Sequence, residues 1–311
     1  MADRRGRRSR PEVTPTTTPD GALPVWVPSE RQRGRDAYRR TQARRSTLVA
    51  LVSTVVVAGL AVLGLVSSPG WPRVRKSFLD PDVAWASLPK IAEGLWLNVR
   101  VMAVCAVLIV VVAMLLALAR TLRGPAFFPL RALATGYVDV FRGLPLILVL
   151  LLVGFGLPGL RLQGIPTSAV VLGGLALVLT YSAYVAEVFR AGIESVHPSQ
   201  IASARSLGLT RGQTLRHVVL PQAWRRVVPP LLNDLVALSK DSGLISILGA
   251  VDAVRAAQIQ TATYANFTPY VVAGVLFVLL TIPLTRFTDA LAWRSGWLGS
   301  QAGLAGAGAM R

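Results

Sequence analysis

Six apolar runs decide what this chain can fold into. They cover residues 47–67, 95–119, about 135–157, 168–188, about 227–248 and 269–285. Each is close to the ~20 residues that an α-helix needs to cross the ~30 Å hydrocarbon core of a bilayer. Backbone groups in lipid must be hydrogen-bonded internally, and the alternating pattern of membrane barrels is missing. The runs therefore predict an all-α, multi-pass membrane protein with about six transmembrane helices.

The composition excludes the two water-soluble domains that a length of 311 residues would otherwise suggest. Hydrophobic residues make up 53% and charged residues only 15%, so too few polar side chains remain to coat such domains. The net charge of +18 is typical of nucleic-acid-binding proteins, but the basic residues lie between the apolar runs. That distribution indicates topology signals, with the lipid bilayer as partner and no nucleic acid.

The basic residues also predict the orientation. Residues 1–46 are rich in Arg with scattered Pro and Thr, and we expect a disordered cytoplasmic tail there. The segments after the second, fourth and last runs are basic as well. Six alternating spans place all of these segments on one side, which the positive-inside rule makes the cytoplasm. Both termini are therefore predicted to be cytoplasmic, the second as a tail of residues 287–311.

Few side chains could support catalysis or bind a metal. Cys105 is the single cysteine, and His197 and His217 are the only histidines. A zinc site or a catalytic triad needs more partners than these. A phosphate-binding loop needs lysine directly after glycine, and none of the lysines follows a glycine. We expect no enzyme activity, no metal and no cofactor in this chain, so any nucleotide is hydrolysed by another polypeptide.

The cytoplasmic segment 193–221 is longer than a turn requires and predicts two short helices. Pro198 suits a first helical turn, and Gly208 suits a left-handed stop. Thr210 and Gln213 have the spacing of a capping box, and Pro221 is expected to end the second helix. The apolar face of this hairpin is too short for a core. It packs either on the chain's own helices or in a partner's groove, and the periodicity favours neither.

The same segment resembles the loop signature of ABC importer inner-membrane permeases, in their polar amino-acid branch. That signature reads Glu-Ala-Ala, three residues, Gly, nine residues, Ile, one residue and Leu-Pro. The chain keeps both spacings, with alanine in place of the glutamate. The matching residues are Ala202, Ser203, Ala204, Gly208, Val218, Leu220 and Pro221. In the family this coupling loop fits a cleft on a cytoplasmic ATPase, so Ala202 removes an acidic contact that many relatives can form.

Other motifs resemble the same family in the expected order. They are FRGLP (141–145), AYVAEVFR (183–190), LPQA (220–223), PPLLND (229–234) and KDS (240–242). The resemblance covers about residues 95–286 and implies a five-helix permease domain there, with 47–67 as an additional helix. It implies a cytoplasmic ABC ATPase dimer that binds ATP, a second permease subunit, identical or paralogous, and an extracytoplasmic amino-acid-binding protein. It places the chain in a prokaryotic cell membrane and leaves the transported amino acid open.

The fifth run carries the polar residues of a candidate substrate pathway. Ionisable residues at membrane depth cost ~2.5–3.5 kcal/mol each, so they should face a cavity or one another. Helix positions seven apart point almost the same way, which aligns Asn233 with Lys240 and Asp234 with Asp241. The candidate pathway residues are Asn233, Asp234, Lys240, Asp241 and Ser242. Pairing among these side chains, which would hold the bundle together, is the alternative interpretation.

Three local features complete the membrane region. Gly243, among serines, favours a kink or break in the fifth span. Glu187 and Arg190 stand three apart and can form an ion pair on one helix face. Residues 127–141 mix apolar and charged side chains and predict an interfacial elbow before the third span.

Two other functions remain open from the residues alone. An ion-gradient-driven secondary transporter could use Asp234 and Asp241 as proton or cation sites, although no inverted repeat is evident. A membrane-anchored scaffold would use its basic tail as an interaction module and would move no solute.

Overall fold

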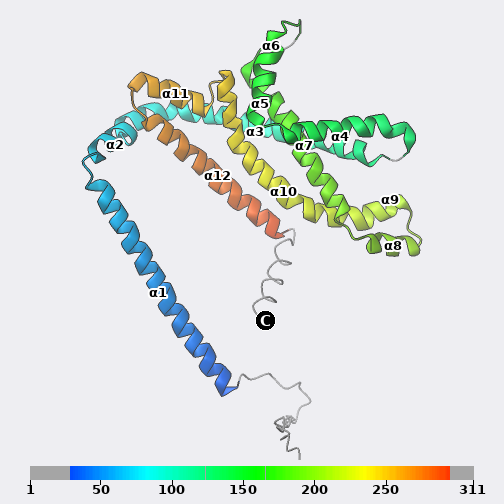
Figure 1. Ribbon diagram of the computed structural model, residues 1–311, viewed down its shortest axis with the longest axis horizontal. Coiled ribbons are helices and arrows are strands. Elements are labelled where there is room, and N and C mark those ends of the chain that lie inside the picture. Colours follow the sequence, from blue (N-terminus) through cyan, green and yellow to red (C-terminus); the bar gives the residue numbers. More distant parts are fainter. Residues whose placement is uncertain (1–28, 123, 165, 295–311) are drawn as a thin grey trace, which may run out of the picture. The chain divides into compact units, whose positions relative to one another are not determined.

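The computed structural model describes residues 29–122, 124–164 and 166–294, and every regular element in them is helical (Figure 1). The chain divides into two units, residues 1–71 and 72–311. The elements are α1 (Glu30–Val66), α2 (Trp71–Phe78), α3 (Pro81–Thr121), η1 (Pro125–Phe127), α4 (Phe128–Gly143), α5 (Leu146–Leu151), η2 (Leu152–Gly156), α6 (Leu157–Gly159), α7 (Ala169–Glu194), α8 (Pro198–Ser206), α9 (Arg211–Thr214), η3 (Leu215–Val219), α10 (Leu220–Asp241), η4 (Ser242–Leu248), α11 (Ala253–Tyr264) and α12 (Thr268–Arg294).

The first unit contains one long helix, α1. Its segment Arg45–Val66 is long and apolar enough to span a membrane, and its large apolar side chains from Leu48 to Val66 are exposed. The helix begins at Glu30, so the expected disorder is wrong for residues 30–46. Extending a helix costs less than starting one, and this stretch is rich in good helix formers. Residues 1–28 of the predicted tail lie outside the described residues.

The described residues hold four helices that are long and apolar enough to span a membrane, or up to six spans if two bent pairs each count once. The four are Arg45–Val66, Trp71–Thr121, Ala169–Glu194 and Thr268–Ala292. They match the predicted first, second, fourth and sixth spans. α12 runs on to Arg294, so residues 287–294 of the expected tail are helical, and residues 295–311 lie outside the described range.

The predicted third span is not one straight helix. It is divided at Leu144, and the helices on either side of the break are bent by 107°. Pro145 has no N–H and disfavours helical backbone at the preceding residue, and Leu144 is extended with φ −92° and ψ 137°. The predicted elbow, residues 127–141, corresponds to the end of η1 and most of α4.

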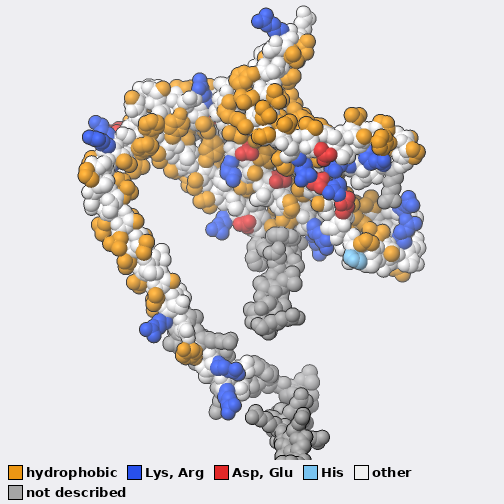
Figure 2. Space-filling view, viewed as in Figure 1, with side chains coloured by type: hydrophobic (Ala, Val, Ile, Leu, Met, Phe, Trp, Pro, Cys, Tyr) orange, Lys and Arg blue, Asp and Glu red, His pale blue; other side chains and the backbone are white. Residues whose placement is uncertain are grey.

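α7 is the central helix of the second unit. Within its most apolar 18-residue window, 67% of the residues are buried, against 28% for Trp71–Thr121 and 11% for Thr268–Ala292. Its buried side chains share one apolar core with α3 and α10. Gly192 permits the close approach to α10, because a Cβ there would lie 2.1 Å from a methyl group of Val227. Figure 2 shows hydrophobic side chains over much of α3 to α6, with charged side chains gathered between α4 and the α8–α9 end.

A smaller core joins the amino-terminal part of α3 to α11 and α12. Asn98 on α3 donates from Nδ2 to Asp252 Oδ2 at 3.0 Å, and its Oδ1 accepts from the Ala253 amide at 3.1 Å. Asp252 is fully buried and also accepts the Arg255 amide at 2.9 Å. Gly94 is needed beside this junction, since a Cβ would lie 2.4 Å from the Asp252 carbonyl carbon. These contacts fix the start of α11 on α3.

The fifth span changes character where the sequence predicts a break. α10 ends at Asp241, and the tighter 3₁₀ segment η4 runs from Ser242 to Leu248. Gly249 then turns the chain with φ +93°, and α11 departs at 52° from the preceding helical axis. The helix therefore tightens near Gly243, as the sequence suggests, but the bend itself lies after Leu248, at Gly249.

Candidate functional site

The candidate pathway residues fall into three groups by burial. Asn233 and Lys240 are exposed, whereas Asp234 and Asp241 are partly buried. Ser242 is completely buried and donates to the Ser239 carbonyl at 2.9 Å, so its hydroxyl is occupied within the helix. In the described part of the chain, no ion pair involves any of these residues.

Tyr181 on α7 joins this group. Its hydroxyl donates a 2.7 Å hydrogen bond to Asp241 Oδ2 on α10. From the sequence alone, Tyr181 could hydrogen-bond a substrate but ranks below the residues of the fifth span, because aromatic side chains near an interface usually anchor a helix. The signal that could have found it is its position beside small residues on a central helix, where its phenol must find a polar partner.

Asp234 lines a small cavity between α3, α7 and α10. The cavity has a volume of about 190 Å³ and is otherwise mostly apolar, with Tyr181, Leu231 and Leu238 among its walls. Oδ2 of Asp234 is buried and has no hydrogen-bond partner in the described part of the structure. A polar atom in that condition costs free energy unless something else binds it. Asp234 is therefore the pathway residue best placed to receive a donor from a solute.

A cluster of charges ties three helices together beside this region. Glu187 on α7 pairs with Arg120 on α3 at 2.9 Å and with Arg142 on α4 at 3.8 Å. The predicted Glu187–Arg190 pair is confirmed, and Arg190 also pairs with Glu194. The side chains of Arg120 and Glu187 are only 14% and 19% exposed, so the pair is largely shielded from solvent. The motifs FRGLP and AYVAEVFR thus meet in space through Arg142 and Glu187.

The hairpin of residues 196–219, predicted to be cytoplasmic, has most of its predicted geometry. Gly208 turns the chain with φ +82° after α8. Thr210 and Gln213 form the predicted capping box, with Gln213 Oε1 accepting the Thr210 amide at 2.9 Å and Thr210 Oγ1 accepting the Gln213 amide at 3.3 Å. Leu207 at the tip is 83% exposed. The hairpin therefore presents an apolar residue at its end.

Pro221 does not end the second helix, contrary to expectation. α9 continues through the π-helical turn η3 directly into α10, with Pro221 in its first turn. A proline in a regular helix clashes with the carbonyl four residues earlier, and a wider π turn before it changes that geometry. α9, η3 and α10 are therefore one continuous helix.

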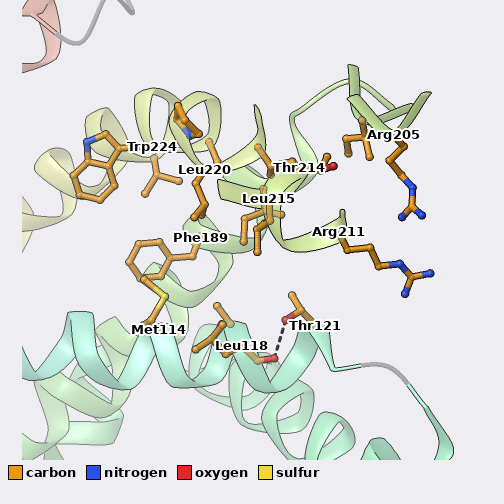
Figure 3. Close-up of a pocket in the computed structure, with 17 residues that line it drawn as sticks. Met114, Leu118, Thr121, Phe189, Arg205, Arg211, Thr214, Leu215, Leu220 and Trp224 are labelled. Carbon is orange, nitrogen blue, oxygen red and sulfur yellow. Dashed lines mark hydrogen bonds between the residues drawn. The ribbon is translucent and has the colours of Figure 1, made fainter. Parts of the chain in front are cut away.

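A cavity of about 970 Å³ lies between the hairpin and the helices below it (Figure 3). Met114 and Leu118 of α3, Phe189 of α7, and Leu215, Leu220 and Trp224 face it. Arg205 and Arg211 stand at one end, and their side chains extend away from the apolar residues in Figure 3. The matched loop residues are distributed between exposed Ala202, Ser203, Gly208, Leu220 and Pro221, half-buried Val218 and buried Ala204.

All charged side chains on the hairpin and on the first part of α10 are basic. Between residues 195 and 233 the sequence has no Asp or Glu, and its five arginines, Arg205, Arg211, Arg216, Arg225 and Arg226, are all exposed. Arg226 donates to the Ser195 carbonyl and so ties α10 to the end of α7. No group of three or more metal-ligating side chains occurs in the described residues.

Comparison with known proteins decides the family. Residues 110–295 match the family described as the inner membrane component of binding-protein-dependent transport systems. The chain belongs to this family. The arginine transport system permease ArtQ of Bacillus subtilis is 34% identical over 214 residues, which are 68% of this chain and 95% of ArtQ. The glutamate transport system permease GluC of Corynebacterium glutamicum is 34% identical over 64% of this chain and 92% of GluC.

Solved structures agree with this assignment. A crystal structure of an amino acid ABC transporter with histidines has a chain that is 32% identical, with a TM-score of 0.61 over 66% of this chain and 94% of that one. An inward-facing methionine ABC transporter, MetNI, shares the fold at 19% identity and a TM-score of 0.54. The resemblance to ABC permeases is thus confirmed. It is favoured over the two alternatives, an ion-gradient-driven secondary transporter and a membrane-anchored scaffold. The chain is a multi-pass ABC permease and not an enzyme, and membership implies a separate ATPase partner.

Proposed function

We propose that this permease carries a polar amino acid into a prokaryotic cell, driven by ATP hydrolysis on a separate subunit. The observation that carries the proposal is the position of the Tyr181–Asp241 hydrogen bond. It joins α7 to α10, the two helices that the hairpin connects directly. A displacement of the hairpin therefore acts on both sides of this bond. The relatives, named for arginine, glutamine and glutamate transport, support a polar amino acid as substrate.

The charges in the pathway suit a zwitterion. An α-amino acid carries one carboxylate and one ammonium group. Lys240 is an exposed cation that can attract the carboxylate, and Asp234 has a buried oxygen with no described partner that can accept from the ammonium. Asp241 contributes a second negative charge beside Tyr181. Asn233 and Ser242 complete the proposed pathway, Asn233 as an exposed polar group and Ser242 at the helix break.

The hairpin is the proposed contact with the ATPase. Leu207 projects at its tip, and Arg205 and Arg211 flank it with exposed positive charge. Because no acidic residue balances them, an apolar cleft with an acidic rim is the complementary surface. We assign such a cleft to the ATPase subunits, which bind the ATP. A second permease copy or paralogue and an extracytoplasmic amino-acid-binding protein complete the proposed complex.

Uptake into proteoliposomes tests the function. The complex is reconstituted with its ATPase and binding protein, and entry of radiolabelled glutamate, glutamine, arginine and histidine is followed. We expect uptake of at least one of these amino acids, and only when ATP is present on the side of the membrane that the ATPase faces. Lys240→Ala and Asp241→Ala are expected to abolish uptake without loss of ATPase from the complex. Uptake driven by an ion gradient without ATP, or unchanged uptake by both variants, would overturn the proposal.

A further inference from the structure

A second apolar groove lies apart from the candidate pathway residues and the hairpin. It runs between α3 and α7 and has a volume of about 440 Å³. Its walls include Val101, Val104 and Leu108 from α3 and Val171, Leu175 and Val178 from α7. Val104 is 62% exposed and Val171 is 51% exposed, so the groove is open toward the surroundings of the bundle.

One cation lies in this groove. Arg100 is its only charged lining residue, and its side chain is exposed. No hydrogen bond or ion pair joins Arg100 to another described residue. Arg120, further along the same helix, differs in being paired with Glu187. A cation within a membrane-spanning helix normally finds an anionic partner or reaches the headgroup level.

Helix geometry places Arg100 at that level. Arg100 and Arg120 are twenty residues apart on α3, which is about 30 Å at 1.5 Å per residue and equals the thickness of the hydrocarbon core. The two arginines are therefore spaced so that each can lie near one boundary of the core. The groove extends along α3 from Leu97 to Leu108, about 16 Å, which is close to the depth of one leaflet. In the predicted topology this is the extracytoplasmic leaflet.

We propose that the α3–α7 groove binds a phospholipid, with an acyl chain along the valine and leucine walls and the phosphate at Arg100. The apolar walls cannot satisfy a zwitterionic amino acid, so the groove is not a second substrate site. Phosphate is the complementary anion for an unpaired guanidinium at the membrane surface. A phospholipid follows from three features of the groove: its position along α3, its apolar walls and the charge of Arg100. It does not depend on which solute the permease carries.

Photolabelling in nanodiscs tests the site. The full chain, assembled with its partner subunits, is placed in nanodiscs of phosphatidylcholine with a phosphatidylglycerol that carries a diazirine on its acyl chain. Labelled peptides are identified by mass spectrometry. Label is expected on residues 101–108 and 171–178. Arg100→Gln is expected to reduce the labelling of these segments about fivefold when the lipid probe is not saturating. That is the loss typical of one basic contact to an anionic lipid surface. Arg75→Gln, at an exposed arginine of α2 that does not line the groove, is the matched control and should label normally.

A pair of filling variants provides the second measurement. Val104→Trp occupies the groove, whereas Val107→Trp changes a residue of similar exposure, 66%, on the same helix but outside the groove. The first is expected to block labelling and the second is not. Equal labelling of all four variants, label confined to other segments, or a Val104→Cys thiol that cross-links to α1 or to a second copy of the chain would overturn the proposal. Should either tryptophan variant fail to assemble, the arginine pair alone decides the outcome.

Discussion

The Tyr181 hydroxyl donates to the Asp241 carboxylate across the interface between α7 and α10, at 2.7 Å. The residues are 60 positions apart in sequence, and the segment between them contains the whole cytoplasmic hairpin. Since α9 continues without a break into α10, we expect motion of the hairpin to be transmitted along α10 toward Asp241. We therefore expect the conformational change of the transport cycle to strain or break this hydrogen bond.

Removing this bond is expected to impair transport. Tyr181→Phe keeps the ring and deletes the donor, leaving Asp241 without its described partner. Hydrogen bonds to charged groups contribute ~1.5–3 kcal/mol, so ATP-driven uptake should fall about tenfold or more. Tyr184→Phe is the matched control, because its hydroxyl makes only a 3.4 Å contact with the Arg142 carbonyl. Equal uptake by the two variants would show that the Tyr181–Asp241 bond has no role in transport.

A substitution at Asp234 distinguishes a role in substrate binding from a role in stability. Asp234→Asn keeps the size of the side chain and removes a charge whose buried oxygen has no described partner. Burying a neutral amide costs less than burying a carboxylate, so the melting temperature should stay the same or rise. Uptake is nevertheless expected to be lost, because the amide cannot neutralise an ammonium group. A drop in melting temperature with normal specific uptake would assign Asp234 to stability alone.

The charge cluster around Glu187 is expected to stabilise the bundle. Glu187→Gln removes the partner of Arg120, Arg142 and Arg190 at a largely shielded position. We expect the melting temperature of the purified permease to fall by about 5 °C, from the ~1.5–3 kcal/mol of charged hydrogen bonds and the scaling for proteins of this size. Glu194→Gln removes only the ion pair with Arg190, in which the Glu194 side chain is 61% exposed. This variant should change the melting temperature little. Equal shifts for the two variants would contradict the assignment.

Much of this arrangement follows from local sequence, and the rest does not. The apolar runs predict α7 and α12 well, because helix formation in lipid depends on composition over ~20 residues. The capping box at Thr210 and the turn at Gly208 are also local. The bend at Leu144 was missed because a hydropathy run averages over one proline. Contacts such as Asn98 with Asp252, 154 residues apart, depend on how helices pack, and periodicity carries no such information.

Reversing the hairpin charge tests the predicted acidic cleft. Arg205→Glu with Arg211→Glu is expected to release the ATPase from the complex, whereas Arg205→Gln with Arg211→Gln should weaken it only partly. Co-purification of ATPase at low and high salt measures the effect, because screening reduces attraction and repulsion alike. Unchanged co-purification of the double glutamate variant at low salt would argue against an acidic partner surface.

The central claim is that the hairpin tip is held by the ATPase, and a thiol placed at Leu207 tests it most directly. Cys105, the single native cysteine, is only 3% exposed, so Leu207→Cys provides one accessible thiol. Trp85→Cys, at a residue that is 78% exposed at the amino-terminal end of α3, is the control. A short bifunctional cross-linker in the assembled complex is predicted to join Leu207→Cys, and not Trp85→Cys, to the ATPase subunit. An intact complex in which Leu207→Cys reacts freely with a small maleimide and never cross-links to the ATPase would contradict the account.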